Sequence, residues 1–137
     1  MRRLLTLLAL LVTLTLAGCA TDQRNQALST TLLHYANTVR WGDFQQAMQY
    51  IDPKELQEHP PTSLELSRFA QYRVSGYEEG QGPMPNGENE VRQLVQISLI
   101  NVNTQAERTV LDRQTWRYDP EKKRWYLMSG LPKLDNE

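Results

Sequence analysis

The sequence has little of the chemistry that disulfide and metal sites need. It contains one cysteine, Cys19, and two histidines, His34 and His59. A single cysteine cannot form an internal disulfide, and it excludes a zinc site built from several cysteines. Neither histidine has a Cys or Asp partner at ligand spacing, so we predict no metal site and no cofactor. We interpret His34 as flanking a helical core face or exposed, and His59 as a loop residue before two prolines.

An excess of positive charge is also missing. The chain has 137 residues with 15 Lys and Arg against 16 Asp and Glu, a formal net charge of −1. Binding to nucleic acid depends on neutralising many phosphates, so this composition predicts no nucleic-acid partner. The length predicts one domain with one modest hydrophobic core.

No apolar run is long enough to span a bilayer. The charge-free run Leu4–Leu16 has about 13 residues, against the roughly 20 that a spanning helix needs. Arg2 and Arg3 precede this run, and small residues follow it, which is the pattern of a secretory signal. The sequence therefore predicts a signal peptide over residues 1–18 that is removed, with an uncleaved membrane anchor as the alternative.

The end of this segment, Leu16-Ala17-Gly18-Cys19, resembles the lipobox of bacterial lipoproteins at all four positions. The resemblance implies that a diacylglyceryl group joins the Cys19 thiol, that cleavage falls between Gly18 and Cys19, and that the new amino terminus is acylated. Several acyl chains anchor a protein stably, whereas one chain binds marginally. Gram-negative lipoproteins kept at the inner membrane tend to have Asp after the cysteine. Here Ala20 follows, so the resemblance implies the outer membrane, inner leaflet, facing the periplasm.

The rest of the chain is predicted to form one domain. Residues 19–21 are the lipidated N-terminus and a short tether, residues 22–132 the domain, and residues 133–137 a C-terminal tail. Apolar residues at helical spacing predict a helix over residues 22–41, which Gly42 ends. Three further helix starts follow, each with an N-cap residue and Glu or Gln three positions later. The three pairs are Asp43 with Gln46, Asp52 with Glu55, and Thr62 with Glu65.

The second half of the domain has the signals of β-strands. Alternating segments predict four strands, and a loop rich in Gly, Pro and Asn separates the first two over residues 82–90. The predicted strands cover residues 71–81, 91–103, 107–118 and 124–129. Helices followed by antiparallel strands predict an α+β fold, with N-terminal helices packed on a curved antiparallel sheet of about four strands.

This order of elements resembles the nuclear transport factor two-like superfamily, a cone-shaped fold that includes ketosteroid isomerase and scytalone dehydratase. The similar features are the first helix ending in RWGDF at 40–44, the short second helix, and a closing hairpin with Trp116 and RWYLMSGLP at 124–132. A cystatin-like helix-on-sheet arrangement is the alternative. Superfamily members use the concave sheet face for a ligand or partner peptide and dimerise through the other face, so the resemblance implies a homodimer as one arrangement.

The candidate site lies on the strand predicted over residues 107–118. Side-chain alternation places four residues on one face, which form a pocket if that face is concave: Asp112, Gln114, Trp116 and Tyr118. Burial there would raise the pKa of Asp112 and make it a candidate general base, as the aspartate base of ketosteroid isomerase suggests. No dyad or triad matches the superfamily enzymes, so we assign no catalytic residue. The alternatives are a solvated face, or an ion pair of Asp112 with an arginine such as Arg92.

Two other sets of side chains, the tryptophans and a group of basic residues, are predicted to have structural roles, with a binding role as the alternative. Tryptophans Trp41, Trp116 and Trp125 are predicted to pack in the core or on the sheet, with an exposed aromatic patch as the alternative. A basic cluster near the last hairpin is predicted to be solvated, with contact to anionic lipid headgroups or peptidoglycan as the alternative. This cluster contains Arg108, Arg113, Arg117, Lys122, Lys123 and Arg124.

Together these observations favour a non-enzymatic lipoprotein held at the membrane by Cys19. It faces the periplasm and acts as a binding or scaffold module for a protein partner in the cell envelope. One alternative is a cone-fold protein that binds a small hydrophobic ligand. The other is a lipid-anchored isomerase or dehydratase that uses Asp112, although a fold does not by itself imply a function.

Overall fold

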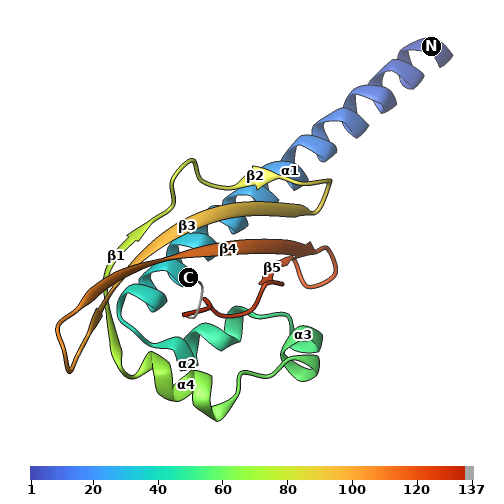
Figure 1. Ribbon diagram of the computed structural model, residues 1–137. Coiled ribbons are helices and arrows are strands. Elements are labelled where there is room, and N and C mark those ends of the chain that lie inside the picture. Colours follow the sequence, from blue (N-terminus) through green and yellow to red (C-terminus); the bar gives the residue numbers. More distant parts are fainter. Residues whose placement is uncertain (135–137) are drawn as a thin grey trace.

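The first helix is much longer than the sequence pattern predicts. The computed structural model describes residues 1–134, except for the side chains of residues 10–17. Helix α1 (Arg2–Arg40) is continuous, and its N-terminal part projects away from the domain (Figure 1). The helix does not begin at residue 22 because the preceding segment is rich in Leu and Ala, which favour helix. Among the described residues, no helix combines the length and apolarity needed to cross a membrane.

The structure describes the two ends of the predicted domain only in part. Side chains of the lipobox residues Leu16 and Ala17 fall outside the described residues, as do residues 135–137 of the predicted tail. Leu134 is described and is buried in the core. The packed domain therefore extends past residue 132, because the end of the chain folds back against the sheet and covers apolar surface.

Short helical elements follow α1 and are set by their N-caps. The Asp43 carboxylate accepts a hydrogen bond from the backbone of Gln46, but in the described chain no side-chain bond returns from Gln46. At Thr62 both bonds of a capping box form with Glu65. The predicted starts are thus confirmed, and the predicted box at Asp43 is wrong in its second half. These elements are α2 (Phe44–Ala47), the 3-10 helix η1 (Met48–Tyr50), α3 (Pro53–Glu58) and α4 (Ser63–Phe69).

An antiparallel sheet of four main strands confirms the predicted α+β fold. The strands curl into a half-barrel in the order β1-β3-β4-β5, and the short β2, which lies in the predicted loop, pairs with the start of β3 (Figure 1). The predicted first strand ends early because the chain turns at Gly80 and Gly82, which both have positive φ. The strands are β1 (Tyr72–Glu78), β2 (Met84–Pro85), β3 (Glu90–Asn101), β4 (Glu107–Asp119) and β5 (Arg124–Leu127).

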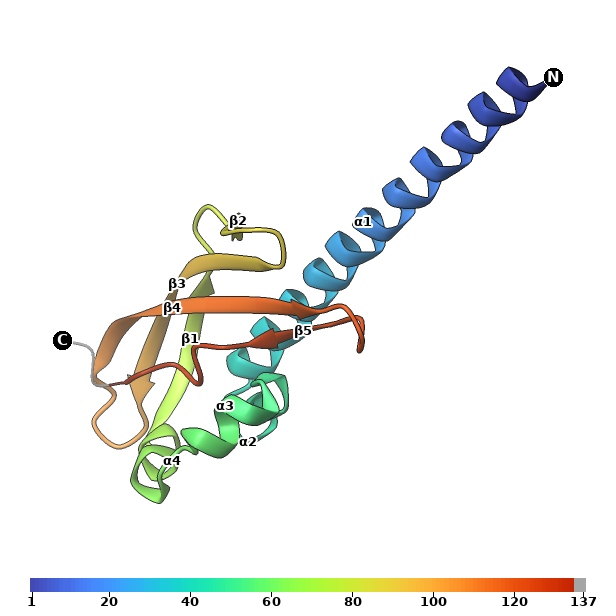
Figure 2. The same ribbon diagram turned by 90° about the vertical axis from the view of Figure 1, so that its right-hand side faces the viewer.

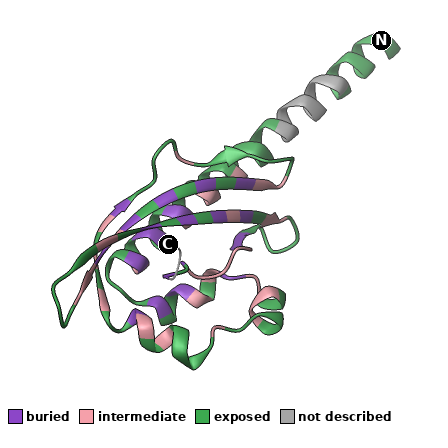
Figure 3. Cartoon of the chain, in the orientation of Figure 1, coloured by how far each residue is buried: buried purple, intermediate pink, exposed green. Residues whose placement is uncertain are grey.

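The core fills the inner, concave face of the sheet. The C-terminal half of α1 packs there, and buried residues line α1, β3 and β4 on the sides that face each other (Figure 3). Even-numbered residues of β4 point inward, so the face that carries Trp116 is buried and not solvated. The ring of Trp116 meets Tyr35 of α1 edge-on, with centroids 5.1 Å apart. Such aromatic pairs add to the stabilisation from apolar burial.

Two of the three tryptophans have the predicted position. Trp116 and Trp125 are buried, which confirms the interpretation as core residues. Trp41 is 88% exposed, so that interpretation is wrong for Trp41. Trp41 is the C-cap residue directly after α1 and keeps a helical backbone conformation. The last residue of the buried stripe is Val39, and two further residues rotate the side chain about 200° to the solvent side.

Candidate functional site

Four buried polar side chains meet on the inner face of the sheet, and we call them the inner polar cluster. Its members come from the three strands β1, β3 and β4, and each is at most 6% exposed: Tyr77, Gln93, Asp112 and Gln114. Buried polar groups are costly unless they are hydrogen-bonded, so the bonds within this cluster decide whether the core can tolerate it.

Gln114 joins the other members of the cluster. Its Nε2 donates to Asp112 Oδ2 at 2.7 Å and to the Tyr77 hydroxyl at 3.0 Å. Its Oε1 accepts from Gln93 Nε2 at 2.8 Å and from Trp116 Nε1 at 3.0 Å. An indole N–H can only donate, so it fixes which end of the Gln114 amide carries oxygen. Both donor hydrogens and both acceptor positions of that amide are thereby used.

The register of the strands places these side chains together. Gln93 and Gln114 lie directly opposite each other on β3 and β4, and Asp112 is two residues before Gln114 on the same face. Tyr77 reaches the cluster because the pairing of β1 with β3 shifts between Val74 and Gly76. A bulge adds one residue and reverses which side chains point inward, so Tyr77 faces the core.

Burial changes the acid–base properties of the cluster. It raises the pKa of Asp112 to about 6, and the hydrogen bond from Gln114 acts against that rise. Burial also raises the pKa of Tyr77 and the pKa of Tyr35, with the Asp112 charge adding to both. A carboxylate that titrates near neutral pH can accept a proton, which is the property that a general base needs. Catalysis by Asp112 stays a prediction, because the residue is 6% exposed and the described partner of its carboxylate is Gln114.

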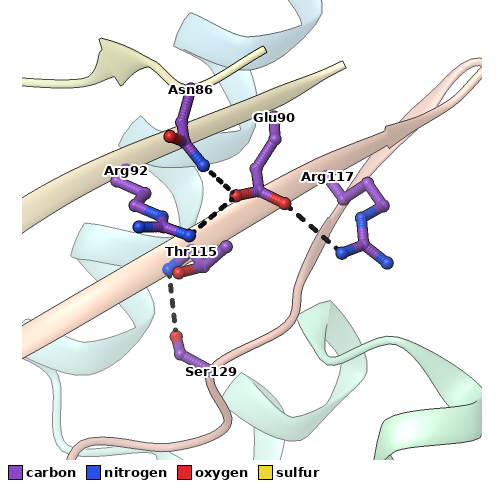
Figure 4. A network of polar contacts seen from close by, with 6 residues as sticks. All are labelled: Asn86, Glu90, Arg92, Thr115, Arg117 and Ser129. Carbon is purple, nitrogen blue, oxygen red and sulfur yellow. Dashed lines mark hydrogen bonds and ion pairs between the residues drawn. The ribbon is translucent and has the colours of Figure 1, made fainter. Parts of the chain in front are cut away.

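The alternative of an ion pair between Asp112 and Arg92 does not form. Arg92 points to the outer face of the sheet, where its Nη2 lies 3.3 Å from Glu90 Oε1, and Glu90 Oε2 lies 3.3 Å from Arg117 (Figure 4). Hydrogen bonding from Asn86, followed by the arginines, lowers the pKa of Glu90. This alternative is wrong because even-numbered residues of β3 and even-numbered residues of β4 face opposite sides of the sheet.

Tyr118 is separate from the other three predicted pocket residues. Asp112, Gln114 and Trp116 line neither of the two cavities described below, whereas Tyr118 lines the smaller one. The Tyr118 ring is half-buried and lies against Trp125 with centroids 5.3 Å apart. The structure thus brings three of the four together in the core, where Trp116 donates to the inner polar cluster, and places the fourth near the end of β4.

The larger cavity lies between α3, α4 and the chain after β5, and has a volume of about 730 Å³. Apolar side chains such as Phe69 and Leu131 line it, and Glu55, Glu58 and His59 stand at its edge. Ligand atoms of these three residues lie within 4.8 Å of one another, and His59 Nδ1 is 2.9 Å from Glu55 Oε1. They could hold a divalent cation, although His59 and Glu58 are exposed. Sequence reasoning did not group these three residues, although their spacing i, i+3, i+4 places them on one face of a helix. His34, the other histidine, is exposed on α1.

The smaller cavity lies beside Cys19 and has a volume of about 300 Å³. Cys19 itself is an exposed, free cysteine on α1. Residues just after it on α1 form one wall, and the end of β4 together with the β4–β5 turn forms the other. The lining residues are Ala20, Thr21, Gln23, Arg24, Tyr118, Pro120 and Lys123. Sequence reasoning missed this cavity because its two walls are about 100 positions apart in the chain, and only the packing of α1 on the hairpin joins them.

The six basic residues predicted as one cluster are dispersed. Arg108 bonds the Leu134 carbonyl at the far end of β4, and Arg117 pairs with Glu90. Arg124 donates to the Gln49 carbonyl at 2.9 Å. The grouping into one cluster is wrong because β4 is long and extended, so residues close in sequence lie far apart along it. The interpretation as solvated side chains is confirmed for all of them except Arg108, which is half-buried. Lys122 and Lys123 remain together, at the β4–β5 turn.

With this geometry established, we compared the chain with known proteins. No known protein family, curated protein or solved structure matches it.

Proposed function

We propose that this protein is a bacterial lipoprotein, anchored through acyl chains on Cys19, that acts as a binding or scaffold module at the membrane. The observation that carries the proposal is the sequence Leu16-Ala17-Gly18-Cys19 behind a short, charge-free apolar run. A thiol is needed because the lipid is joined as a thioether, and the exposed side chain of Cys19 is open to that modification. The outer membrane, inner leaflet, is the proposed location.

The contacts of α1 support a domain held close to the bilayer. Trp125 Nε1 donates to the Arg24 carbonyl at 3.0 Å, and Arg24 Nη1 donates to the Glu88 carbonyl at 2.9 Å. The packed domain thus begins at Arg24, five positions after Cys19. Helical rise over five residues is about 8 Å, so the anchor leaves the domain little freedom to move away from the membrane.

Binding is favoured over catalysis by the state of the polar groups. Every hydrogen-bonding position of the Gln114 amide is already used inside the core. The outer face of the sheet, in contrast, exposes Leu94 and Leu111 by 49% and 40% next to charged and polar neighbours. Apolar side chains within a polar surround are typical of protein interaction surfaces. A partner in the cell envelope, or a second copy of the chain, is the occupant that we propose for this face.

The larger cavity favours a second candidate function, the binding of a small ligand. Its volume of about 730 Å³ falls in the range of ligand pockets, and apolar and charged side chains both line it. The cavity lies outside the cone interior, which Tyr35 and Trp116 fill. A ligand retained by the purified protein in native mass spectrometry, and lost when Phe69 is replaced by Glu, would support this candidate.

Replacing the lipidated residue tests the anchor. We expect the wild-type chain to incorporate radiolabelled palmitate in cells and Cys19→Ala to incorporate none and remain unprocessed. Cys19 is the single cysteine, so thioether-linked label has one attachment point. Gln26→Ala, an exposed position of α1 outside the lipobox, is the matched control and should label normally. Label that persists on Cys19→Ala would contradict the proposal.

Crosslinking in cells tests the scaffold role. With Leu94→Asp and Leu111→Asp on the outer face, we expect loss of a stoichiometric crosslinked partner that the wild-type chain captures repeatedly. Leu64→Asp, an exposed leucine on α4, is the control and should keep the partner. Failure to recover any repeated partner with the wild-type chain, or a partner insensitive to the outer-face changes, would argue against this role.

A further inference from the structure

The end of the domain nearest Cys19 is built from three segments that lie together. Figure 2 shows the β4–β5 turn and the loop after β2 flanking α1 where the helix leaves the sheet. Arg24 of α1 contacts both of the other segments. Its carbonyl accepts a hydrogen bond from Trp125 of β5, and its guanidinium donates to the Glu88 carbonyl and to Asn89 in the loop after β2. If Cys19 is acylated, this end faces the lipid headgroups.

The β4–β5 turn presents two lysines at this end. Asp119 Oδ1 accepts from the backbone N–H groups of Glu121 and Lys122, at 2.9 and 3.0 Å, which fixes a tight turn. Lys123 follows in the left-handed region, with φ +52°. The Lys122 ammonium lies 5.6 Å from the centre of the Tyr126 ring. In the described part of the chain neither lysine forms an ion pair, so both ammonium groups are available to an external anion.

The cavity of about 300 Å³ beside Cys19 has walls of mixed chemistry. Ala20, Tyr118 and Pro120 offer apolar surface, while Arg24 and Lys123 offer positive charge. Lysine binds phosphate as a point charge, and a tyrosine ring suits the boundary between apolar chains and water. Asp119 and Glu121 stand in the same turn and limit the net positive charge. That balance fits one phosphate with an apolar glycerol body rather than a polyanion.

We propose that this cavity binds the phosphate-bearing headgroup of a glycerophospholipid in the leaflet that holds the anchor. The Lys123 ammonium contacts the phosphate, with Arg24 beside it, and the glycerol backbone lies against Tyr118 and Pro120. This inference rests on the proposed function, because acylation of Cys19 is what brings the cavity to the headgroups. The bound lipid would fix the orientation of the domain on the membrane in addition to its tether.

Native mass spectrometry of the full chain in nonionic detergent micelles tests the inference. With phosphatidylglycerol added, we expect the wild-type chain to retain one lipid non-covalently. Lys123→Glu should lower the retained fraction at least about fivefold, since one lysine near an anionic headgroup contributes a factor of this size. Lys123→Gln should give a smaller loss. Lys54→Glu makes the same charge change on exposed α3 and should retain lipid like the wild-type chain.

A lipid without phosphate separates headgroup binding from apolar adhesion. Diacylglycerol has the glycerol body and the acyl chains, and we expect it to be retained much less than phosphatidylglycerol. Equal retention of the two lipids, or equal retention by Lys123→Glu and Lys54→Glu, would overturn the inference. The same spectra report the anchor separately, because acyl groups on Cys19 are covalent and survive collisional activation. A missing covalent mass contradicts the proposed function, whereas the comparison of lysine variants still decides the inference.

Discussion

The inner polar cluster and the rim of the larger cavity both consist of polar side chains, but the cluster is buried and the rim is largely exposed. The rim consists of Glu55, Glu58 and His59. In the cluster, Gln114 makes four hydrogen bonds inside a closed core. At the rim, His59 and Glu58 are exposed and pair with neighbours on the same helix, α3. Water replaces a lost partner at the rim but cannot do so in the core. Polar groups of the cluster therefore hold the fold together, and those of the rim are free to meet a ligand.

Replacing the central amide of the cluster should have the largest effect. Gln114→Leu keeps the size of the side chain and removes its four hydrogen bonds. It leaves four groups without this partner: Asp112, the Tyr77 hydroxyl, Gln93 and the Trp116 N–H. We expect the free energy of unfolding to fall by about 3 kcal/mol or more. Urea unfolding followed by tryptophan fluorescence, with the chain in nonionic detergent, measures this loss.

The matched control makes the same replacement on the outer face. Gln96 is exposed on β3, so Gln96→Leu should change the free energy of unfolding by less than about 0.5 kcal/mol. If both variants lose the same stability, the contrast between cluster and surface does not hold.

The buried carboxyl should make stability depend on pH. The pKa of Asp112 is raised from 3.8 to about 6 by burial, so the folded state binds its proton more tightly than the unfolded state does. The protonated Asp112 therefore stabilises the folded state. This stabilisation is fully present below pH 3.8 and is lost as the pH rises to about 6. Between these two pH limits the free energy of unfolding falls by about 3 kcal/mol, because a change of one in pKa corresponds to about 1.36 kcal/mol.

Asp112→Asn removes the titrating carboxyl, while its amide oxygen can still accept a hydrogen bond from Gln114 and carries no charge. Urea unfolding of both chains between pH 4 and pH 7 should show the wild type losing stability relative to the variant. A parallel pH dependence of the two chains would mean that Asp112 does not titrate in this range.

The sequence pattern predicted which β4 residues share a face, but it decided neither that this face is buried nor all members of the cluster. Alternation places Asp112, Gln114 and Trp116 on one side of a strand, and this local rule needs no knowledge of neighbours. Tyr77 joins them through a shift of the β1 register, which depends on how two strands pair. Alternation from Val74 alone would have pointed Tyr77 outward, so only the assembled sheet reveals it.

The two cavities show the same limit on a larger scale. N-caps at Asp52 and Thr62 predicted where α3 and α4 begin, because a cap acts within three residues. The larger cavity, however, needs the chain after β5 to lie beside those helices, and Leu134 holds it there. No local pattern encodes that contact. Local sequence patterns could predict the elements that line a cavity, whereas the contacts that bring those elements together depend on long-range packing.

A change at the rim should have the smallest effect on stability. His59 Nδ1 lies 2.9 Å from Glu55 Oε1, yet the side chain of His59 is 73% exposed. Exposed ion pairs contribute little, and this one is charged on both sides only while the imidazole is protonated. We expect His59→Ala to change the free energy of unfolding by less than about 0.5 kcal/mol at pH 7 in urea titrations. A loss comparable to that of Gln114→Leu would show that the rim is structural, because only a closed environment makes a missing partner that costly.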